Sequence, residues 1–323
     1  MINISVPSRL HMTLIDLSAT GYRRNGGIGF SIEEPNSSYL FSACAEINLS
    51  LLCEVGYDQA EIVSLSRKLQ KIQVELGFTG ICLAKVSAPA RHSGLGTGTI
   101  TALACIEAYY ILNNHPVEPR EIIFRSGRGG TSGIGIHSYF DGGFLFDVGR
   151  KFDNQEFRSS DDILKPDILP SIFLQQPMPR WPIGIFFPPG HDAVTRETER
   201  RLFAGVLPLT SEEVYKTTYH AVFGICAAVL DSDFEAFCEA TNEIQQCTWK
   251  KSEVALHGTS LVNNINALKE LGANAVGMSS VGPTLFFLAK NFSATMLRIN
   301  QRFPEATVKC TFPSDIGRII SNG

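Results

Sequence analysis

The chain lacks the short motifs that mark several large enzyme classes. Its eight cysteines form no C-x-x-C pair and its seven histidines form no H-x-x-x-H pair, so we expect buried, reduced thiols and no protein-ligated metal. No lysine closes a P-loop, no G-x-G-x-x-G opens a βαβ unit, and no G-x-S-x-G elbow is present. Zinc chemistry, P-loop nucleotide binding, dinucleotide-dependent redox chemistry and serine-based acyl transfer therefore have no support.

Long hydrophobic runs and charge of one sign are also missing. The 28 Lys and Arg residues against 32 Asp and Glu residues give a net charge of −4 without long single-signed runs, which argues against a nucleic-acid surface. No apolar run is long enough to span a bilayer, and the first residues do not resemble a secretion signal. We expect a cytoplasmic protein, a homodimer by default, with no membrane or nucleic-acid partner.

Length and periodicity predict an α+β protein with two domains. The 323 residues, 44% of them hydrophobic, are enough for two cores that share a cleft. A change to charges and prolines over residues 153–182 suggests a boundary or flap there, and we divide the chain into domains 1–170 and 171–323. Alternation and helical periodicity predict strands over 2–6, 10–17, 28–33, 39–44, 81–87, 144–148, 183–187, 275–278, 284–288 and 307–311, and helices over 58–76, 97–112, 118–125, 193–203, 211–230, 231–247, 254–271 and 293–302.

A glycine-rich turn at residues 89–99 lies between a predicted strand and a predicted helix. Glycines let the backbone approach an anion, and the positive end of the following helix favours negative charge. The alternative is a glycine-rich helix start that binds nothing. We expect a phosphate site here, formed by His92, Ser93, Gly94, Leu95, Gly96, Thr97, Gly98 and Thr99.

Three further segments are dense in glycine, hydroxyl groups or cations. In residues 7–16, strand alternation places Arg9, His11 and Thr13 on one face, which either lines a site or meets solvent. Arg24 belongs to an arginine pair before a glycine turn, which suits capture of an anion but also a solvated hairpin tip. Residues 126–137 are too glycine-rich for an ordinary helix or strand, so a ligand pressed against the main chain or a flexible loop is expected.

The order of these segments resembles the GHMP small-molecule kinase superfamily, which includes galactokinase, homoserine kinase and mevalonate kinases. Residues 94–99 resemble its G-L-G-S-S phosphate motif, and residues 277–284 resemble its C-terminal glycine motif. The resemblance implies a ribosomal-protein-S5-like N-terminal domain, a ferredoxin-like C-terminal domain and a ligand between them. By itself, the turn at 277–284 would be an ordinary turn.

One position departs from the kinases. They carry a segment like G-x-P-S-G-V-D, whose acidic residue acts on the substrate hydroxyl, whereas Gly135 stands at that position here. A glycine cannot accept a proton, so the usual route of phosphoryl transfer loses its base. An ATP-dependent kinase would need Asp141 or Asp16 as a replacement, and a phosphosugar-binding protein without catalysis is a third alternative.

Five segments resemble the β-ribofuranosylaminobenzene 5′-phosphate synthase family of methanopterin biosynthesis and its C-nucleoside-forming relatives. They are residues 7–16, 26–29, 92–96, 128–135 and 277–283. The resemblance implies a decarboxylating phosphoribosyltransferase that uses phosphoribosyl diphosphate, Mg²⁺ and no organic cofactor. The acceptor would be an aromatic carboxylate such as 4-aminobenzoate, with 4-hydroxybenzoate or a heteroaromatic dicarboxylate left open.

The same resemblance assigns roles to residues. Diphosphate and phosphate would be held by the 92–99 turn together with Arg128, Gly129, Gly130, Thr131 and Ser132. The acceptor would be held by Arg9, His11 and Arg24, with Asp16 orienting His11 or steadying a cation. Magnesium is expected on the diphosphate, near Thr99 or Asp16, and Ser279, Ser280 and Gly282 are expected to line the cleft.

Overall fold

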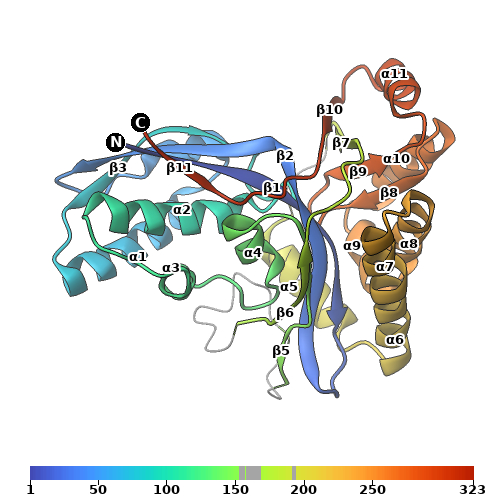
Figure 1. The fold of residues 1–323 in the computed structure, drawn as a ribbon, viewed down its shortest axis with the longest axis horizontal. Coiled ribbons are helices and arrows are strands. Elements are labelled where there is room, and N and C mark those ends of the chain that lie inside the picture. The colour runs from blue at the N-terminus through green and yellow to red at the C-terminus, as the bar shows by residue number, and fades with distance from the viewer. Residues whose placement is uncertain (153–156, 158–168, 191–193) are drawn as a thin grey trace.

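The computed structural model describes residues 1–152, 157, 169–190 and 194–323 of the chain (Figure 1). These residues form an α+β structure with one antiparallel sheet of seven strands and a second of four. The first sheet runs through the N-terminal half, and the second lies in the C-terminal half beside most of its helices (Figure 1). The predicted fold class is confirmed.

Two long strands form the backbone of the first sheet. β1 (Ile2–Asp16) pairs with β2 (Arg23–Cys44), so the four short strands expected in this region are two continuous ones. Irregular register after Val6 and after His11 absorbs the interruptions that the sequence suggested. The remaining strands of this sheet are β3 (Gly80–Ser87), β4 (Phe144–Asp147), β5 (Arg150–Lys151), β6 (Ile172–Gln176) and β11 (Ile319–Asn322).

Helices of the N-terminal half pack against this sheet around a shared core. α2 (Thr97–Leu112) is buried on nearly all sides, and Tyr39 and Phe41 of β2 lie in the same cluster. A helix that is apolar all round belongs inside a protein, and α2 therefore fixes the position of the glycine turn that precedes it. The other helices here are α1 (Gln59–Leu76), α3 (Pro119–Ser126) and α4 (Ile134–Phe140), with a short 3₁₀ turn at Ser50–Val55.

The C-terminal half contains the second sheet, in the order β10-β7-β9-β8. Its strands are β7 (Ile183–Phe187), β8 (Ala275–Met278), β9 (Leu285–Leu288) and β10 (Thr307–Thr311). Its helices are α5 (Arg196–Val206), α6 (Ser211–Tyr219), a π-helical turn (His220–Cys226), α7 (Ala227–Asp231), α8 (Phe234–Gln246), α9 (Thr248–Ala255), α10 (Gly258–Glu270) and α11 (Phe292–Arg302). The prediction of a single helix over 254–271 is wrong. The helix is interrupted between Ala255 and Gly258, and Gly258 has a φ of +68°.

The second glycine-rich segment differs from its prediction. Its last part is helical, since α4 begins at Ile134 and includes Gly135. Burial of Ile134, Ile136 and Tyr139 outweighs the low helix propensity of one glycine. Half of the expected boundary or flap at 153–182 lies outside the described residues, and the described half contains β6, a strand of the first sheet. The division at residue 170 stays a prediction. β6 and β11, which follow that division, both pair within the first sheet.

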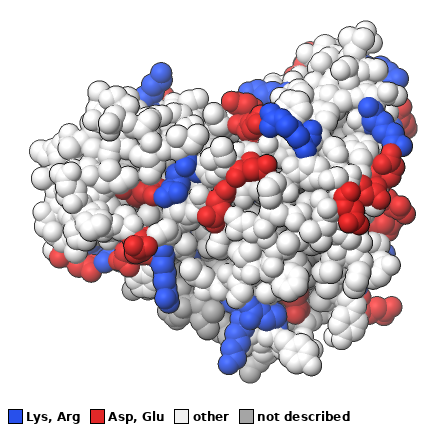
Figure 2. All heavy atoms as spheres, in the orientation of Figure 1, with Lys and Arg blue, Asp and Glu red and all other residues white. Residues whose placement is uncertain are grey.

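The outer surface has no broad patch of one charge on the face in view. Figure 2 shows Lys and Arg side chains interspersed with Asp and Glu over mostly uncharged atoms. Within the described part of the chain, no helix combines the length and hydrophobicity needed to cross a membrane.

Candidate active site

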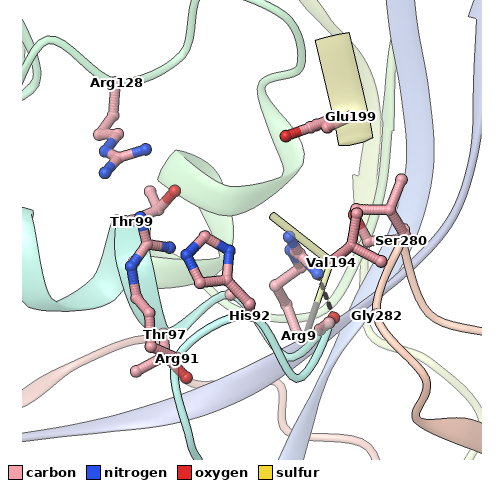
Figure 3. A pocket seen from close by; sticks show the side chains of 14 residues that line it. Arg9, Arg91, His92, Thr97, Thr99, Arg128, Val194, Glu199, Ser280 and Gly282 are labelled. Carbon is pink, nitrogen blue, oxygen red and sulfur yellow. Dashed lines mark hydrogen bonds between the residues drawn. The ribbon is translucent and has the colours of Figure 1, made fainter. Parts of the chain in front are cut away.

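Two adjoining cavities lie where the glycine turn, β1, α5 and the 277–284 turn meet. The first is lined by Arg9, Arg91, His92, Gly94, Gly96, Thr97, Gly98, Thr99, Arg128, Val194, Glu199, Ser280, Val281 and Gly282 (Figure 3). The second is lined by Arg9, His11, Leu14, Thr99, Arg128, Gly129, Thr131, Ser132, Gly135, Glu199, Phe203, Trp249, Glu253, Ser280 and Val281. Because they share Arg9, Thr99, Arg128 and Glu199, a ligand in one lies next to a ligand in the other.

The first cavity is built from backbone that only glycine allows. Gly94 has φ of +91°, and a Cβ atom there would lie 2.3 Å from the carbonyl oxygen of Ser279. Gly96, with φ of +88°, is the N-cap of α2, so the first turn of that helix faces the cavity through Thr97 and Thr99. Amide groups and the helix dipole at this end favour an anion, as the sequence predicted.

Three arginines and a histidine surround this backbone from several elements. Arg9, Arg91, His92 and Arg128 converge on the cavity in Figure 3, and Glu199 reaches it from α5. The Arg91 guanidinium lies 2.9 Å from the Glu61 carboxylate and is held in place by it. Although partial burial raises the pKa of Glu61, its hydrogen bond with His92 and the charge of Arg91 bring that pKa down to about 2. The cavity thus has the charge needed for phosphate groups.

Hydrogen bonds tie three separate segments together at the cavity edge. The Arg9 guanidinium donates to the carbonyl oxygen of Gly94 at 2.6 Å, and the Ser279 hydroxyl donates to the same oxygen at 2.7 Å. The backbone N–H of His11 donates to the Ser279 hydroxyl at 3.0 Å, and the N–H of Ser280 donates to the carbonyl oxygen of His11 at 2.8 Å. β1, the glycine turn and the C-terminal turn therefore form one unit.

A buried lysine lies behind this junction, next to Arg9. The Lys250 ammonium is fully buried and donates to Glu253 at 2.7 Å and to the carbonyl oxygen of Ser280 at 3.0 Å. Burial lowers the pKa of Lys250, and it lowers that of Arg9 to about 10, although the charge of Glu253 opposes both shifts. Glu253 thus stabilises the two cations that approach the cavities.

A polar chain reaches the second cavity from the interior. The Asp147 carboxylate accepts hydrogen bonds from the Ser132 hydroxyl and from the N–H of Gly133, both at 2.9 Å. The His11 Nε2 atom lies 3.3 Å from the Ser132 oxygen, and burial lowers the pKa of His11 well below 6.5. Because Ser132 donates its proton to Asp147, it accepts from a neutral His11 that carries its proton on Nε2.

The second cavity differs in having aromatic walls. Phe203 of α5 and Trp249 of α9 have ring centroids 5.0 Å apart and meet edge to face. Leu14 also lines this cavity, whereas the predicted partner of Arg9 and His11 was Thr13. The register shift between His11 and Thr13 breaks the alternation, so the prediction for Thr13 is wrong.

Most of the expected site residues line one cavity or the other, but several do not. His92, Gly94, Gly96, Thr97, Gly98, Thr99, Arg128, Ser280 and Gly282 line the first, and His11, Gly129, Thr131 and Ser132 line the second. Arg9 lines both. Ser93, Leu95, Gly130 and Ser279 line neither; Leu95 is fully buried in the core, and Ser279 acts through its hydrogen bonds.

Asp16 and Arg24 also lie outside both cavities. The Asp16 carboxylate accepts hydrogen bonds from the N–H and the hydroxyl of Ser18, in the turn after β1. Arg24 is buried, with its guanidinium carbon 4.1 Å from the centroid of the Phe157 ring. The predicted roles of Arg24 in holding the acceptor and of Asp16 in orienting His11 or steadying a cation stay predictions. The positions of the two side chains do not favour these roles.

Sequence reasoning missed Glu199, Phe203, Trp249, Glu253 and Asp147. None belongs to a glycine-rich motif. Trp249 and Glu253 are four residues apart and so share a face of α9, but this spacing occurs on many helices. Only the fold brings α5 and α9 to the glycine turn.

The chain has the fold of the GHMP small-molecule kinases, with a phosphate-type cavity at their glycine turn. A homoserine kinase from Cytophaga hutchinsonii is 16% identical and aligns over 99% of this chain and 97% of its own, with a TM-score of 0.65. A mevalonate kinase from L. major is 12% identical and aligns over 97% and 96%, with a TM-score of 0.64. At these identities the likeness establishes the fold and nothing about the activity. No protein-family model matches the chain.

The chain belongs to the β-ribofuranosylphenol 5′-phosphate synthase family. The synthase of Methanocaldococcus jannaschii is 32% identical over 294 residues, which cover 88% of each chain. That of Methanothermobacter thermautotrophicus is 31% identical over 292 residues, covering 88% of this chain and 87% of its own. The Archaeoglobus fulgidus protein is 29% identical and aligns over 96% and 95%. The family resemblance predicted from five short segments is confirmed along almost the whole chain.

Proposed function

We propose that this enzyme joins phosphoribosyl diphosphate to an aromatic carboxylate, with release of diphosphate and CO₂, to form a C-riboside 5′-phosphate. Its membership of a family of ribofuranosylphenol phosphate synthases supports this reaction. The observation that carries the proposal is the pair of adjoining cavities, one lined by glycines and cations and the other by aromatic rings, which share Arg9 and Thr99. Such a pair suits a phosphorylated sugar beside a benzene ring.

The bond changes balance without an added reactant. The bond between C1 of the ribose and the diphosphate oxygen breaks, and the electron pair leaves with diphosphate. The ring carbon that bears the carboxylate bonds to C1, and loss of CO₂ returns an electron pair to the ring. The chain's tasks are to neutralise the leaving group, align the two carbons and exclude water from C1.

The residues divide these tasks between the cavities. The first turn of α2, with Arg91 and Arg128, would bind the diphosphate and favour its departure. Arg9 lies on the shared edge, where it would hold the acceptor carboxylate next to C1. A neutral His11 beside it adds polarity without a second positive charge, which suits a carboxylate that must leave as an uncharged gas.

The site also argues against the usual kinase route. Gly135, at the position of the kinase acid, lines the second cavity next to Thr99. The missing side chain leaves no carboxylate at that position and leaves room for a ring. Asp16, a candidate replacement base, points into the turn after β1 and lines neither cavity.

Magnesium fits the first cavity as a partner of the diphosphate. Mg²⁺ in such sites uses one or two protein oxygens together with substrate phosphates. The described residues contain no cluster of three or more metal-ligating side chains, and the first cavity offers the Glu199 carboxylate with the Thr99 hydroxyl. We propose that these two groups hold the ion, which would supply charge neutralisation of the diphosphate. Asp16, the other expected neighbour of the ion, does not line this cavity.

The names of the relatives favour one acceptor among the aromatic carboxylates. The relatives are named for a phenol product, which favours a 4-hydroxybenzoate-type acid over 4-aminobenzoate. We propose 4-hydroxybenzoate as the acceptor to test first.

One experiment tests the reaction. The purified chain is incubated with phosphoribosyl diphosphate, Mg²⁺ and either acid, ¹³C-labelled at the carboxylate, while diphosphate and labelled CO₂ are measured together. We expect equal amounts of both, dependent on the acid. Transfer of the γ-phosphoryl group of ATP to an added alcohol, with phosphoribosyl diphosphate left intact, would instead establish a kinase.

A further inference from the structure

The second cavity has two aromatic walls, Phe203 and Trp249, to which the reaction steps described above assign no role. Trp249 is 1% exposed and Phe203 is 5% exposed, yet both line the cavity, so their rings form its floor and not the protein surface. Leu14 lines the same space. Flat apolar walls at this position suit a planar ring, since aromatic faces and edges attract one another beyond the burial of area.

A carboxylate lies in the same cavity. Glu253 is 3% exposed, and its hydrogen bond with Lys250 is made through Oε2. Among the described residues, no hydrogen bond to its Oε1 atom is found. Glu253 lines the second cavity, so its Oε1 atom can accept a hydrogen bond from a ligand bound there.

We propose that the second cavity is the acceptor subsite, in which Trp249 and Phe203 contact the ring and the Glu253 carboxylate accepts a hydrogen bond from a hydroxyl group para to the reacting carbon. The inference rests on the proposed function. It names the acceptor class as benzoates with a para hydrogen-bond donor. Trp249 and Glu253 are one turn apart on α9, so a single helix presents both the ring contact and the acceptor oxygen.

The hydrogen bond to Glu253 strengthens during the reaction. When the ring carbon bonds to C1 of the ribose, positive charge spreads to the para oxygen and makes its proton more acidic. A carboxylate that accepts this proton partly or fully stabilises the intermediate, and the proton returns to oxygen when CO₂ leaves and the ring is aromatic again. Glu253 is then a catalytic residue that favours the transition state over the bound acid.

The Lys250 ammonium is the charge partner of the Glu253 carboxylate. It donates to both Glu253 and the carbonyl oxygen of Ser280, so it holds the carboxylate next to the C-terminal turn. The pair is neutral overall, which lowers the free-energy cost of burying both groups.

The test starts with the unchanged enzyme and a set of acids. Diphosphate release is followed with 4-hydroxybenzoate, 4-methoxybenzoate and benzoate at saturating phosphoribosyl diphosphate. The methoxy group donates electrons to the ring but has no proton to give. We expect kcat with 4-methoxybenzoate to be lower by about a hundredfold. Equal rates with the hydroxy and methoxy acids would overturn the role of Glu253.

Variants then separate ring contact from proton acceptance. Glu253→Gln should lower kcat with 4-hydroxybenzoate by about a hundredfold, and by much more than kcat with 4-methoxybenzoate, so that the preference for the hydroxy acid is lost. Trp249→Phe and Phe203→Ala should raise KM for the acid by about tenfold, with KM for phosphoribosyl diphosphate unchanged. Trp181→Phe is the matched control, because Trp181 packs on Phe234 and Phe237 and lines neither cavity.

Two further measurements guard against misfolding. The double variant Lys250→Met, Glu253→Gln removes the unpaired ammonium that the single variant leaves, and it should show the same loss of preference for the hydroxy acid. In the Trp181→Phe background, Trp249 is the one remaining tryptophan, and its fluorescence should change when 4-hydroxybenzoate binds.

The outcomes distinguish two failures. If the unchanged enzyme releases no diphosphate with any aromatic acid, the proposed reaction is wrong. If it does react, but Trp249 and Phe203 variants keep their KM and Glu253→Gln keeps its kcat, the reaction stands and the acceptor lies elsewhere.

Discussion

The two cavities are neighbours, yet they are built in opposite ways. The first depends on main chain, because Gly94 and Gly96 bring backbone to positions that a side chain would block. The second depends on side chains, with Phe203 from α5 and Trp249 from α9 as its walls. A phosphate requires only amide groups and positive charge, whereas a ring requires shape. The difference suggests that the first cavity tolerates few substitutions and the second can be retuned.

The sharpest way to break this comparison is to add one methyl group to the first cavity. Gly94→Ala places a Cβ atom 2.3 Å from the Ser279 carbonyl oxygen, at φ of +91°. We expect a loss of at least about 4 kcal/mol of unfolding free energy, measured by urea denaturation, and loss of activity. Gly77→Ala is the control, since Gly77 has φ of +69° but nothing within 4 Å, and should cost about 1 kcal/mol. Equal losses would show that space around Gly94 is not limiting.

The contrast between the cavities also explains what sequence could reveal. The glycine turn is a local pattern, and each of its glycines is needed where it stands, so its place before α2 was predictable. The aromatic cavity joins residues 14, 203 and 249, which are far apart in the chain and belong to no motif. Their meeting depends on how the two halves of the molecule pack, and periodicity carries no information about that.

Smaller errors have the same origin. A single extra residue at the register shift after His11 places Leu14 at the cavity in place of Thr13. Arg24 follows a pattern typical of an anion site, but its guanidinium lies over Phe157, a contact made by residues more than a hundred positions apart. The sequence indicated which residue types belong near the site, but it did not indicate which side chains point into the cavities.

A pH titration tests the polar support of the second cavity. Burial raises the pKa of Asp147 from its ordinary 3.8 to about 6, although hydrogen bonds from Gly149, Ser132 and Gly133 oppose the shift. Between pH 3.8 and about 6, the folded state therefore keeps a proton on Asp147 that the unfolded state has already lost. Its contribution to stability is complete below pH 3.8 and is lost as the pH rises to about 6, by about 3 kcal/mol.

Asp147→Asn removes this titration and serves as the comparison. The unfolding free energy of the unchanged protein minus that of the variant should fall by about 3 kcal/mol between pH 4 and pH 7. Glu61, whose pKa lies at about 2, titrates below this window and is present in both proteins. A difference that does not vary with pH would mean that Asp147 ionises as an exposed carboxylate does.

Filling the second cavity should separate folding from acceptor binding. A Cβ atom at Gly135 would lie 3.4 Å from the Cγ2 atom of Thr99, an ordinary contact, and Gly135 is within α4. Gly135→Ala should keep or raise stability by up to about 1 kcal/mol while raising KM for the acid about tenfold. Gly135→Asp should raise that KM about a hundredfold, because its charge repels the carboxylate.

The affinity for phosphoribosyl diphosphate is the control for both Gly135 variants. Isothermal titration should give Kd values within about twofold of the unchanged enzyme, because the first cavity is intact. A parallel loss of affinity for both substrates would show that the two cavities act as one site.

The smallest expected effect concerns two hydroxyl groups of the glycine turn. Ser93 lines neither cavity, and its buried hydroxyl has no hydrogen-bond partner among the described residues, whereas Thr99 lines both. Ser93→Ala should leave the Kd for phosphoribosyl diphosphate unchanged and raise stability by about 0.5 kcal/mol, since an unsatisfied polar group is removed. Thr99→Val, which keeps the shape of the side chain, should weaken binding about fivefold through the loss of one oxygen ligand of the proposed Mg²⁺ ion. If Ser93→Ala weakened binding as much as Thr99→Val, the serine would have to turn toward the ligand on binding. The glycine turn would then adapt to its ligand as the aromatic cavity does, and the contrast between a fixed and a tunable cavity would be lost.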